Sequence, residues 1–169
     1  MKPLELKTRR TIIRHFNEDD AGFILTLLNE PAFVKNIGDK QVRSLEDALD
    51  YLVNGPMASY RDNGFGLYCV AEGLSGQAIG MCGLVNRPEL TLPDLGYAVL
   101  TSHCQQGLAK EASEAVLSHA KHSLRLNTLQ AVTLPDNAPS NRLLISLGFE
   151  FLDTVDLYDA TNNLYQIEL

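Results

Sequence analysis

The stretch Tyr97-Ala-Val-Leu-Thr-Ser-His-Cys-Gln-Gln-Gly-Leu-Ala-Lys-Glu-Ala112 decides the fold of this chain. It continues a short apolar run that starts at Leu95, and then passes through small polar residues and a glycine turn into an amphipathic helix. A helix that begins at the end of a strand offers unpaired N–H groups and a positive dipole end to an anion. Gly107 has no Cβ, so the backbone there can approach a bulky ligand closely. The pattern predicts a phosphate-binding site.

Length and charge narrow the class of protein. The chain has 169 residues, which predicts a single domain spanning residues 1–169, and its composition (45% hydrophobic, 21% charged) is typical of a globular protein. The 14 Lys and Arg residues against 21 Asp and Glu give a net charge of −7. We therefore expect no nucleic-acid partner, because affinity for the phosphate backbone needs clustered cations. An acidic surface favours cationic partners instead, including amines.

The cysteines and the apolar runs bear on metal binding and on location. The three cysteines, Cys69, Cys82 and Cys104, are odd in number and lack a C-x-x-C spacing, so we expect neither a disulfide framework nor a metal site. Cys69 and Cys82 lie in strand-like runs and are predicted to be buried. The first residues lack the apolar core of a signal peptide, and no apolar run approaches ~18 residues. We expect a cytoplasmic protein with no membrane partner.

Apolar periodicity and turn residues give the order of the expected elements. A helix is predicted after Asn17 and ends at Pro31, a second follows Ser44 and is interrupted at Gly55-Pro56, and two more begin near Leu108 and Pro139. Strands are predicted at residues 11–16, 67–72, 78–85, 95–100, 129–134, 149–157 and 164–169. This order is typical of an α+β domain with a mixed, mostly antiparallel sheet of six to seven strands and about four helices.

Four motifs resemble those of the GCN5-related N-acetyltransferase (GNAT) superfamily. Cys104-Gln-Gln-Gly-Leu-Ala-Lys-Glu-Ala112 is similar to the motif Trp-Gly-Lys-Gly-Tyr-Ala-Thr-Glu-Ala that begins the family's central helix. The other three are Gly96-Tyr97, Thr11-Ile-Ile-Arg14, and Asn137-Ala-Pro-Ser140-Asn141 followed by Leu147-Gly-Phe149. The resemblance covers nearly the whole chain and looks closest to the branch of ribosomal-protein alanine and serine N-acetyltransferases.

The resemblance implies a GNAT fold with splayed central strands, acetyl-CoA as the donor and a primary amine as the acceptor. In the family, the turn before the central helix binds the CoA pyrophosphate, and the adjoining strand end pairs with the pantetheine arm as an added strand would. Carried over to this chain, the cofactor-binding residues are Ala98, Val99, Leu100, Gln105, Gln106, Gly107, Leu108, Ala109, Lys110, Asn137, Ser140 and Asn141. Gln105 and Gln106 replace the family's glycine and cation, and Lys110 is the candidate to supply the missing charge.

Acetyl transfer also needs groups that move protons. The acceptor must lose a proton, because an aliphatic ammonium has a pKa of ~10.4, and the leaving thiolate must gain one. Many relatives use a tyrosine as the acid, but Leu144 stands in its place. The resemblance to the ribosomal-protein branch, in which a serine at the position of Ser140 is assigned to the thiolate, implies Ser140 as the acid. Asp94 is the predicted base, and ordered water or one of three other carboxylates is the alternative: Glu89, Asp156 or Asp159. Arg14 could bind a substrate carboxylate or pair with a local acid.

The sequence thus predicts an N-acetyltransferase that works by direct attack of an amine on acetyl-CoA, without a metal. The loops at residues 33–43, 86–93 and 158–163 are expected to shape the acceptor pocket. The acceptor is either a protein N-terminus or a small-molecule amine, and the protein is a monomer or a homodimer. The competing hypothesis is a non-catalytic acyl-CoA-binding module of the same fold. A nucleotide enzyme is disfavoured, because neither a G-x-x-x-x-G-K-[ST] nor a G-x-G-x-x-G motif is present.

Overall fold

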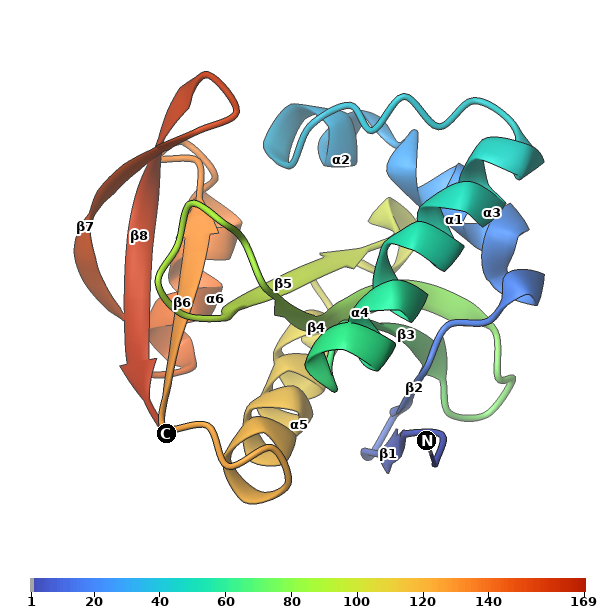
Figure 1. The fold of residues 1–169 in the computed structure, drawn as a ribbon, viewed down its shortest axis with the longest axis horizontal. Helices are drawn as coiled ribbons and strands as arrows, with labels where there is room; N and C mark the ends of the chain where they lie inside the picture. Colours follow the sequence, from blue (N-terminus) through green and yellow to red (C-terminus); the bar gives the residue numbers. More distant parts are fainter. Residues whose placement is uncertain (1) are drawn as a thin grey trace.

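A computed structural model describes residues 2–169, and one mixed sheet of eight strands runs through it (Figure 1). The strand order is β1-β2-β3-β4-β5-β6-β8-β7. The strands are β1 (Glu5–Lys7), β2 (Thr11–Arg14), β3 (Leu67–Glu72), β4 (Ala78–Val85), β5 (Asp94–Val99), β6 (Thr128–Thr133), β7 (Glu150–Leu157) and β8 (Ala160–Glu168). The expected fold class is confirmed, with eight strands in place of six to seven because β1 is short and was not predicted.

Helices cover both faces of the sheet. They are α1 (Ala21–Leu28), α2 (Pro31–Asn36), α3 (Leu45–Asn54), α4 (Pro56–Asn63), α5 (Leu108–His122) and α6 (Ala138–Ser146), with short 3₁₀ turns at Glu18–Asp20 and Thr101–His103. Figure 1 shows α1 to α4 gathered on one side of β2 to β4, with α5 and α6 on the other side of the sheet. The described chain therefore has six α-helices where about four were expected.

Several predicted helix boundaries are confirmed. The Asn17 side chain caps the 3₁₀ turn before α1 by accepting a hydrogen bond from the Asp19 N–H. Ser44 caps α3 by accepting one from the Asp47 N–H at 3.1 Å. Gly55 separates α3 from α4, as the Gly55-Pro56 pair predicted. These local side-chain and backbone effects can be read from a few neighbouring residues.

Two expectations about the loops are wrong. Pro31 was expected only to end a helix, but it occupies the first turn of α2, where its missing N–H costs no hydrogen bond. Residues 33–36 are therefore helical, and the loop predicted at 33–43 starts only after Asn36. The loop predicted at 158–163 is a two-residue turn, because β8 already begins at Ala160. The loop expected at 86–93 is confirmed.

The sheet is nearly split between β5 and β6. These two strands are parallel and pair in register at a single position, Asp94 opposite Gln130, whereas all the other pairings are antiparallel and longer. Beyond that position the strands diverge, with β6 running beside β8 and β5 running beside β4 (Figure 1). The predicted splay of the central strands is thus present, and it leaves one long edge of β5 without a partner strand.

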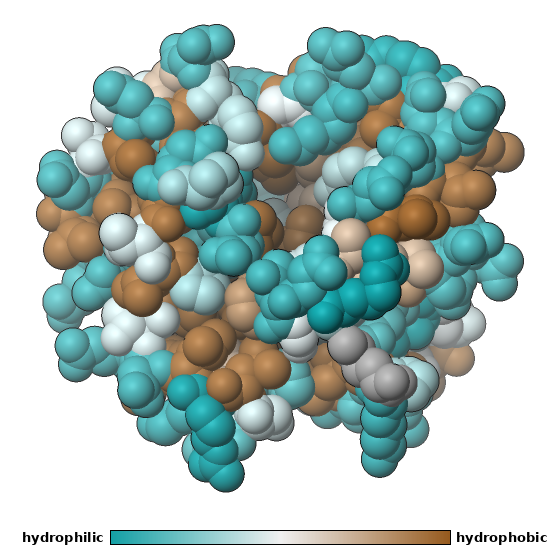
Figure 2. Space-filling model, viewed as in Figure 1, coloured by the Kyte–Doolittle hydropathy of each residue, from teal (hydrophilic) through white to brown (hydrophobic). Residues whose placement is uncertain are grey.

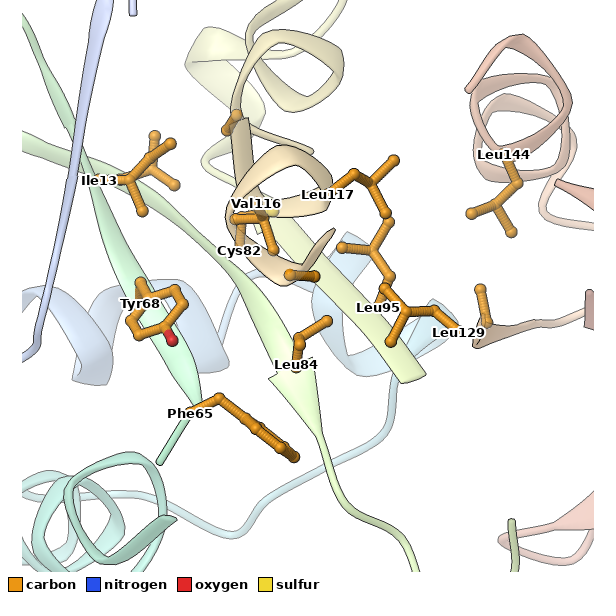
Figure 3. Packing of buried hydrophobic residues seen from close by; sticks show 14 of the residues in the cluster. Ile13, Phe65, Tyr68, Cys82, Leu84, Leu95, Val116, Leu117, Leu129 and Leu144 are labelled. Atoms are coloured by element: carbon orange, nitrogen blue, oxygen red, sulfur yellow. The ribbon is translucent and has the colours of Figure 1, made fainter. Parts of the chain in front are cut away.

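The hydrophobic core beneath α5 keeps this arrangement in place. Val116 and Leu117 of α5 lie over Leu84 of β4 and Leu95 of β5, and Leu144 of α6 points towards Leu129 of β6 (Figure 3). Leu84, Val116, Leu129 and Leu144 are each 1% exposed or less, and burying such side chains contributes about 1.5–3 kcal/mol apiece. Because one core spans both sides of the split, the separation of β5 from β6 is fixed by side-chain packing.

All three cysteines are free thiols. Cys69 and Cys82 are buried free thiols, as predicted, and Cys104 is exposed. Within residues 2–169, no group of three or more metal-binding side chains comes together. None of the described helices combines the length and apolarity needed to span a membrane.

Candidate active site

The turn from β5 into α5 takes a conformation that directs backbone towards solvent. Gly107 is the N-cap of α5 and has a φ of 75°, in the left-handed region that favours glycine. Gln105 is also left-handed, with a φ of 59°. The family motif has glycine at that position. In this chain the left-handed backbone conformation of Gln105 costs about 1 kcal/mol, and the turn is kept.

Six consecutive N–H groups at this turn are free. Among the described residues, the backbone N–H groups from Gln105 to Lys110 donate no hydrogen bond, and the first bonded one is that of Glu111, which donates to the Gly107 carbonyl at 3.0 Å. The positive end of the 15-residue helix α5 adds to their effect. Free donors on an exposed turn with a helix dipole behind them can bind an anion, and a pyrophosphate fits this chemistry.

Arg10 supplies a cation that the sequence analysis missed. Its Nη1 donates to the Gln106 carbonyl at 2.8 Å, and its Nε donates to the Glu111 carboxylate at 2.8 Å. The Arg10 N–H and the Thr8 hydroxyl also donate to Glu111, so the turn after β1 is fastened to the start of α5. Nearly 100 residues separate these partners along the chain, so no local pattern could have indicated them. Lys110, the predicted cation, is half-buried on α5.

If this turn binds the pyrophosphate of acetyl-CoA, as the family resemblance implies, we expect Arg10→Gln to weaken acetyl-CoA binding by about three- to tenfold, because it removes a charge beside the turn and a hydrogen bond that holds it. Calorimetric titration with acetyl-CoA measures this change. Arg9→Gln is the matched control, because Arg9 is exposed and contacts neither Gln106 nor Glu111. Equal affinities for the two variants would show that Arg10 does not act on this site.

The open edge of β5 provides a second binding element. The Leu100 N–H donates to the Ile79 carbonyl of β4, so by strand alternation the backbone groups of Val99 and Tyr97 face the open side towards β6. β5 has no register partner on that side beyond Asp94. An extended ligand carrying amide groups could pair there as an added strand.

A tyrosine and a serine meet across the split. The Tyr97 hydroxyl lies 2.6 Å from the Ser140 Oγ and 3.3 Å from the Ser140 carbonyl oxygen, which joins β5 to the first turn of α6. Burial raises the pKa of Tyr97 to about 12, so the phenol keeps its proton at neutral pH. Both residues belong to the motifs quoted above, but nothing in the sequence indicates that they touch. Leu144, at the family's tyrosine position, is fully buried.

The start of α6 is held by two asparagines. Asn137 is the N-cap, and its Oδ1 accepts a hydrogen bond from the Ser140 N–H at 3.4 Å. The Asn141 Oδ1 accepts hydrogen bonds from Thr133 and Tyr165, and its Nδ2 donates to the carbonyls of Leu134 and Pro135. The Asn141 side chain is therefore used within the protein, where it fixes the start of α6 against β6 and β8.

Asp94 lies at the point where β5 and β6 divide. Its side chain is 0% exposed, and both carboxylate oxygens accept from the Arg87 Nε at 3.0 Å. Burial raises the pKa of Asp94 to about 6, although the charge of Arg87 acts in the opposite direction. A buried carboxylate with a pKa near neutrality can take up a proton, but a substrate could reach it only through water or after a local movement.

The other candidates occupy less enclosed positions. Glu89, Asp156 and Asp159 are exposed. Arg14 forms a bidentate ion pair with Asp20, at 2.8 and 2.9 Å, so of the two predicted roles the local pairing is the one found. That hydrogen-bonded pairing raises the pKa of Arg14. Of the carboxylates considered as a base, only Asp94 combines burial with a raised pKa.

A split sheet with a donor-rich turn after the central strand is the architecture of an acetyltransferase. The family description "Acetyltransferase (GNAT) domain" matches residues 10–150, and the chain belongs to this family. The resemblance drawn from the motifs is thereby confirmed, as is the likeness in structure to ribosomal-protein acetyltransferases.

Known relatives agree with this assignment. YoaA of Bacillus subtilis, an uncharacterized N-acetyltransferase, is 26% identical over 146 residues, which cover 86% of this chain and 82% of YoaA. An acetyltransferase structure from Agrobacterium tumefaciens matches with a TM-score of 0.85 and 22% identity, covering 99% of this chain and 95% of that one. RimL, a ribosomal L7/L12 α-N-protein acetyltransferase solved with coenzyme A, has a TM-score of 0.82 and 14% identity, with 98% of each chain covered.

Proposed function

We propose that this protein transfers an acetyl group from acetyl-CoA to a primary amine, by direct attack of the amine on the thioester. The observation that carries the proposal is the run of free N–H groups from Gln105 to Lys110, next to the open edge of β5. The pyrophosphate would lie at the turn, with Gly107, Leu108 and Ala109 as donors and Arg10 as the counter-charge. The pantetheine arm would pair with β5 at Ala98, Val99 and Leu100 and pass Asn137 and Ser140.

In this mechanism the chain moves two protons. Acetyl-CoA supplies a thioester, and a C–N bond forms at its carbonyl while the C–S bond breaks. The Ser140 hydroxyl gives a proton to the departing sulfur and takes one from the Tyr97 hydroxyl, 2.6 Å away. Solvent then reprotonates Tyr97 and takes up the proton that Asp94 has received, so both groups are restored. Asp94 receives the proton of the acceptor amine through water, since its carboxylate is enclosed beside Arg87. Asn141 contributes by holding Ser140's helix in place.

The test is release of CoA thiol from acetyl-CoA in the presence of an amine panel. The panel contains ribosomal-protein N-terminal peptides, polyamines, amino acids and their amides. Thiol release that depends on one of these amines, with the acetylated product seen by mass spectrometry, supports the proposal. Acetyl-CoA that binds with no release for any amine favours the alternative, a non-catalytic acyl-CoA-binding module. Two departures from the family pattern favour that alternative. Leu144 stands where many relatives have the tyrosine acid, and Gln105 stands where the family has glycine.

We expect kcat/KM to rise with pH up to about 6 and then level off, because Asp94 must be ionised to accept a proton and burial raises its pKa to that value. Asp94→Asn should remove this rise of kcat/KM with pH and lower kcat/KM by about 100-fold. Asp153→Asn is the control, since Asp153 is exposed on β7 and is not among the candidate bases. If kcat/KM of the Asp94→Asn variant still rises with pH near 6, a group other than Asp94 accepts the proton of the amine.

A further inference from the structure

A second cluster of polar side chains lies where three loops meet. We call it the Tyr158 cluster, and it consists of Lys40 before α3, Arg87 after β4, and Tyr158 in the turn between β7 and β8. The Lys40 Nζ lies 5.2 Å from the centre of the Tyr158 ring, and the Arg87 guanidinium carbon lies 5.7 Å from the same centre. The Arg87 Nη1 also donates to the Tyr158 hydroxyl at 2.6 Å. One tyrosine thus holds two cations that come from separate loops.

The turn that presents Tyr158 is unusual. Tyr158 and Asp159 have φ values of 53° and 59°, so both are left-handed although neither is glycine. A bulky aromatic residue rarely adopts this region, and such strain persists where the surroundings hold it. Here the turn places an exposed aromatic ring within cation–π distance of both Lys40 and Arg87.

Lys40 is the cation of the cluster that has no counter-ion in the described part of the chain, whereas Arg87 lies near the carboxylates of Asp94 and Glu89. Arg87 is paired with Asp94, but within residues 2–169 no carboxylate lies within ion-pair distance of Lys40. The neighbouring Asp39 is already bound by Arg43 at 2.6 Å. Burial, and to a smaller extent the charge of Arg87, lowers the pKa of Lys40. In a chain with a net charge of −7, a half-buried lysine without a carboxylate partner among the residues described needs an explanation.

The cluster adjoins the β5–β6 split, because Arg87 is bound to Asp94 at that point. Asp94 and Gln130 are opposite one another in the β5–β6 pairing, so their side chains point to the same face of the sheet. Ala98 of β5 points to that face as well and packs against the core beneath α1 to α3, while Leu95 packs under α5. The Gln130 Oε1 is buried without a hydrogen-bond partner, which leaves an acceptor open there. Figure 2 shows a hollow on this face with hydrophilic residues around it.

We infer that the acceptor amine carries an anionic group, a carboxylate or a phosphate, which binds between Lys40 and Arg87 beside the Tyr158 ring. The inference rests on the proposed function, since it names the class of amine that the same site accepts. Lys40 contributes an ammonium with three donors and no counter-ion, and Arg87 has an Nη2 without a partner among the described residues. The competing explanation is a structural latch, in which the cluster only ties the β7–β8 turn to the other loops.

Matched acceptors separate these explanations. The pairs are amino acids with their amides, and phosphoethanolamine with ethanolamine, assayed by CoA release. We expect Lys40→Gln to lower kcat/KM at least about tenfold for the anionic member of the preferred pair and less than about twofold for the neutral member. Lys40→Arg should retain most of the preference because it keeps the charge. Lys35→Gln, at an exposed lysine of α2, should alter neither.

The outcomes also identify the anion and separate the two proposals. Preference for the amino acids identifies a carboxylate, and preference for phosphoethanolamine identifies a phosphate. Equal losses for both members of a pair in Lys40→Gln, or no preference in the unaltered protein, overturn the inference and leave the acetyltransferase proposal intact. NMR titration with inorganic phosphate and with acetate provides a readout without turnover. Shifts at Lys40 and Tyr158 in a protein that acetylates no amine would support the anion site while the proposed function fails.

Discussion

Ser140→Ala is expected to lower kcat by about 100-fold while the Kd for acetyl-CoA changes less than about twofold. The hydroxyl lies at the first turn of α6, 2.6 Å from the Tyr97 hydroxyl, and it is the group proposed to give a proton to the departing sulfur. The backbone groups proposed to bind the donor are untouched by the change. Steady-state kinetics with the preferred amine, together with calorimetric titration of acetyl-CoA, measure both quantities.

Two further variants sharpen this result. Tyr97→Phe should lower kcat by about tenfold, because the serine keeps its own proton but loses the group that replaces it. Ser146→Ala is the matched control, since Ser146 is an exposed serine of the same helix whose hydroxyl bonds only to the Leu143 carbonyl. An unchanged kcat in Ser140→Ala would reject the assignment of the acid, and a loss in Tyr97→Phe alone would move that role to Tyr97.

Gly83→Ala is expected to destabilise the protein by about 3 kcal/mol, the largest effect of any single methyl group in the sheet. A Cβ at Gly83 would lie 2.1 Å from the Gly66 carbonyl oxygen and 2.8 Å from the Leu67 Cα. Both atoms belong to the backbone and cannot rotate away. Gly83 pairs with Leu67 of β3, so β3 or β4 would have to shift.

Thermal or urea unfolding measures this loss, which corresponds to a fall in Tm of about 6–12 °C for a chain of this size. Gly22→Ala is the control, because no atom lies within 4 Å of the added carbon on α1. That variant should be more stable by about 0.5–1 kcal/mol, since alanine favours the helix interior. A Gly83→Ala protein as stable as the unaltered one would mean that β3 and β4 are held less rigidly than their pairing indicates.

The fold could be predicted because its signals are local. The strand, turn and helix around Gly107 and the caps at Asn17 and Ser44 each depend on a few adjacent residues, and the structure confirms them. Pro31 was misjudged because the same residue favours a helix start and excludes a helix interior. Only packing decides between these roles, and Phe33 of α2 is buried in the core beneath that helix.

The site could be predicted only in part, for a reason of distance along the chain. The turn at Gln105 to Ala109 was found because its donors are consecutive. Arg10 reaches that turn from 96 residues away, and Lys40 and Arg87 meet at a tyrosine 71 residues beyond Arg87. The 43 residues between Tyr97 and Ser140 likewise conceal their contact. Single-sequence patterns do not encode which distant loops converge, so these groups required the fold.

The single point of pairing between β5 and β6 has a consequence for how the enzyme would respond to its surroundings. The gap beyond it is filled, in our proposal, by the long arm of the donor, and most of that arm is identical in acetyl-CoA and in free CoA. Free CoA would therefore make nearly all of the contacts that bind acetyl-CoA, and the two would compete for the gap between β5 and β6. Activity in a cell would then follow the ratio of acetylated to free CoA more closely than the concentration of acetyl-CoA alone.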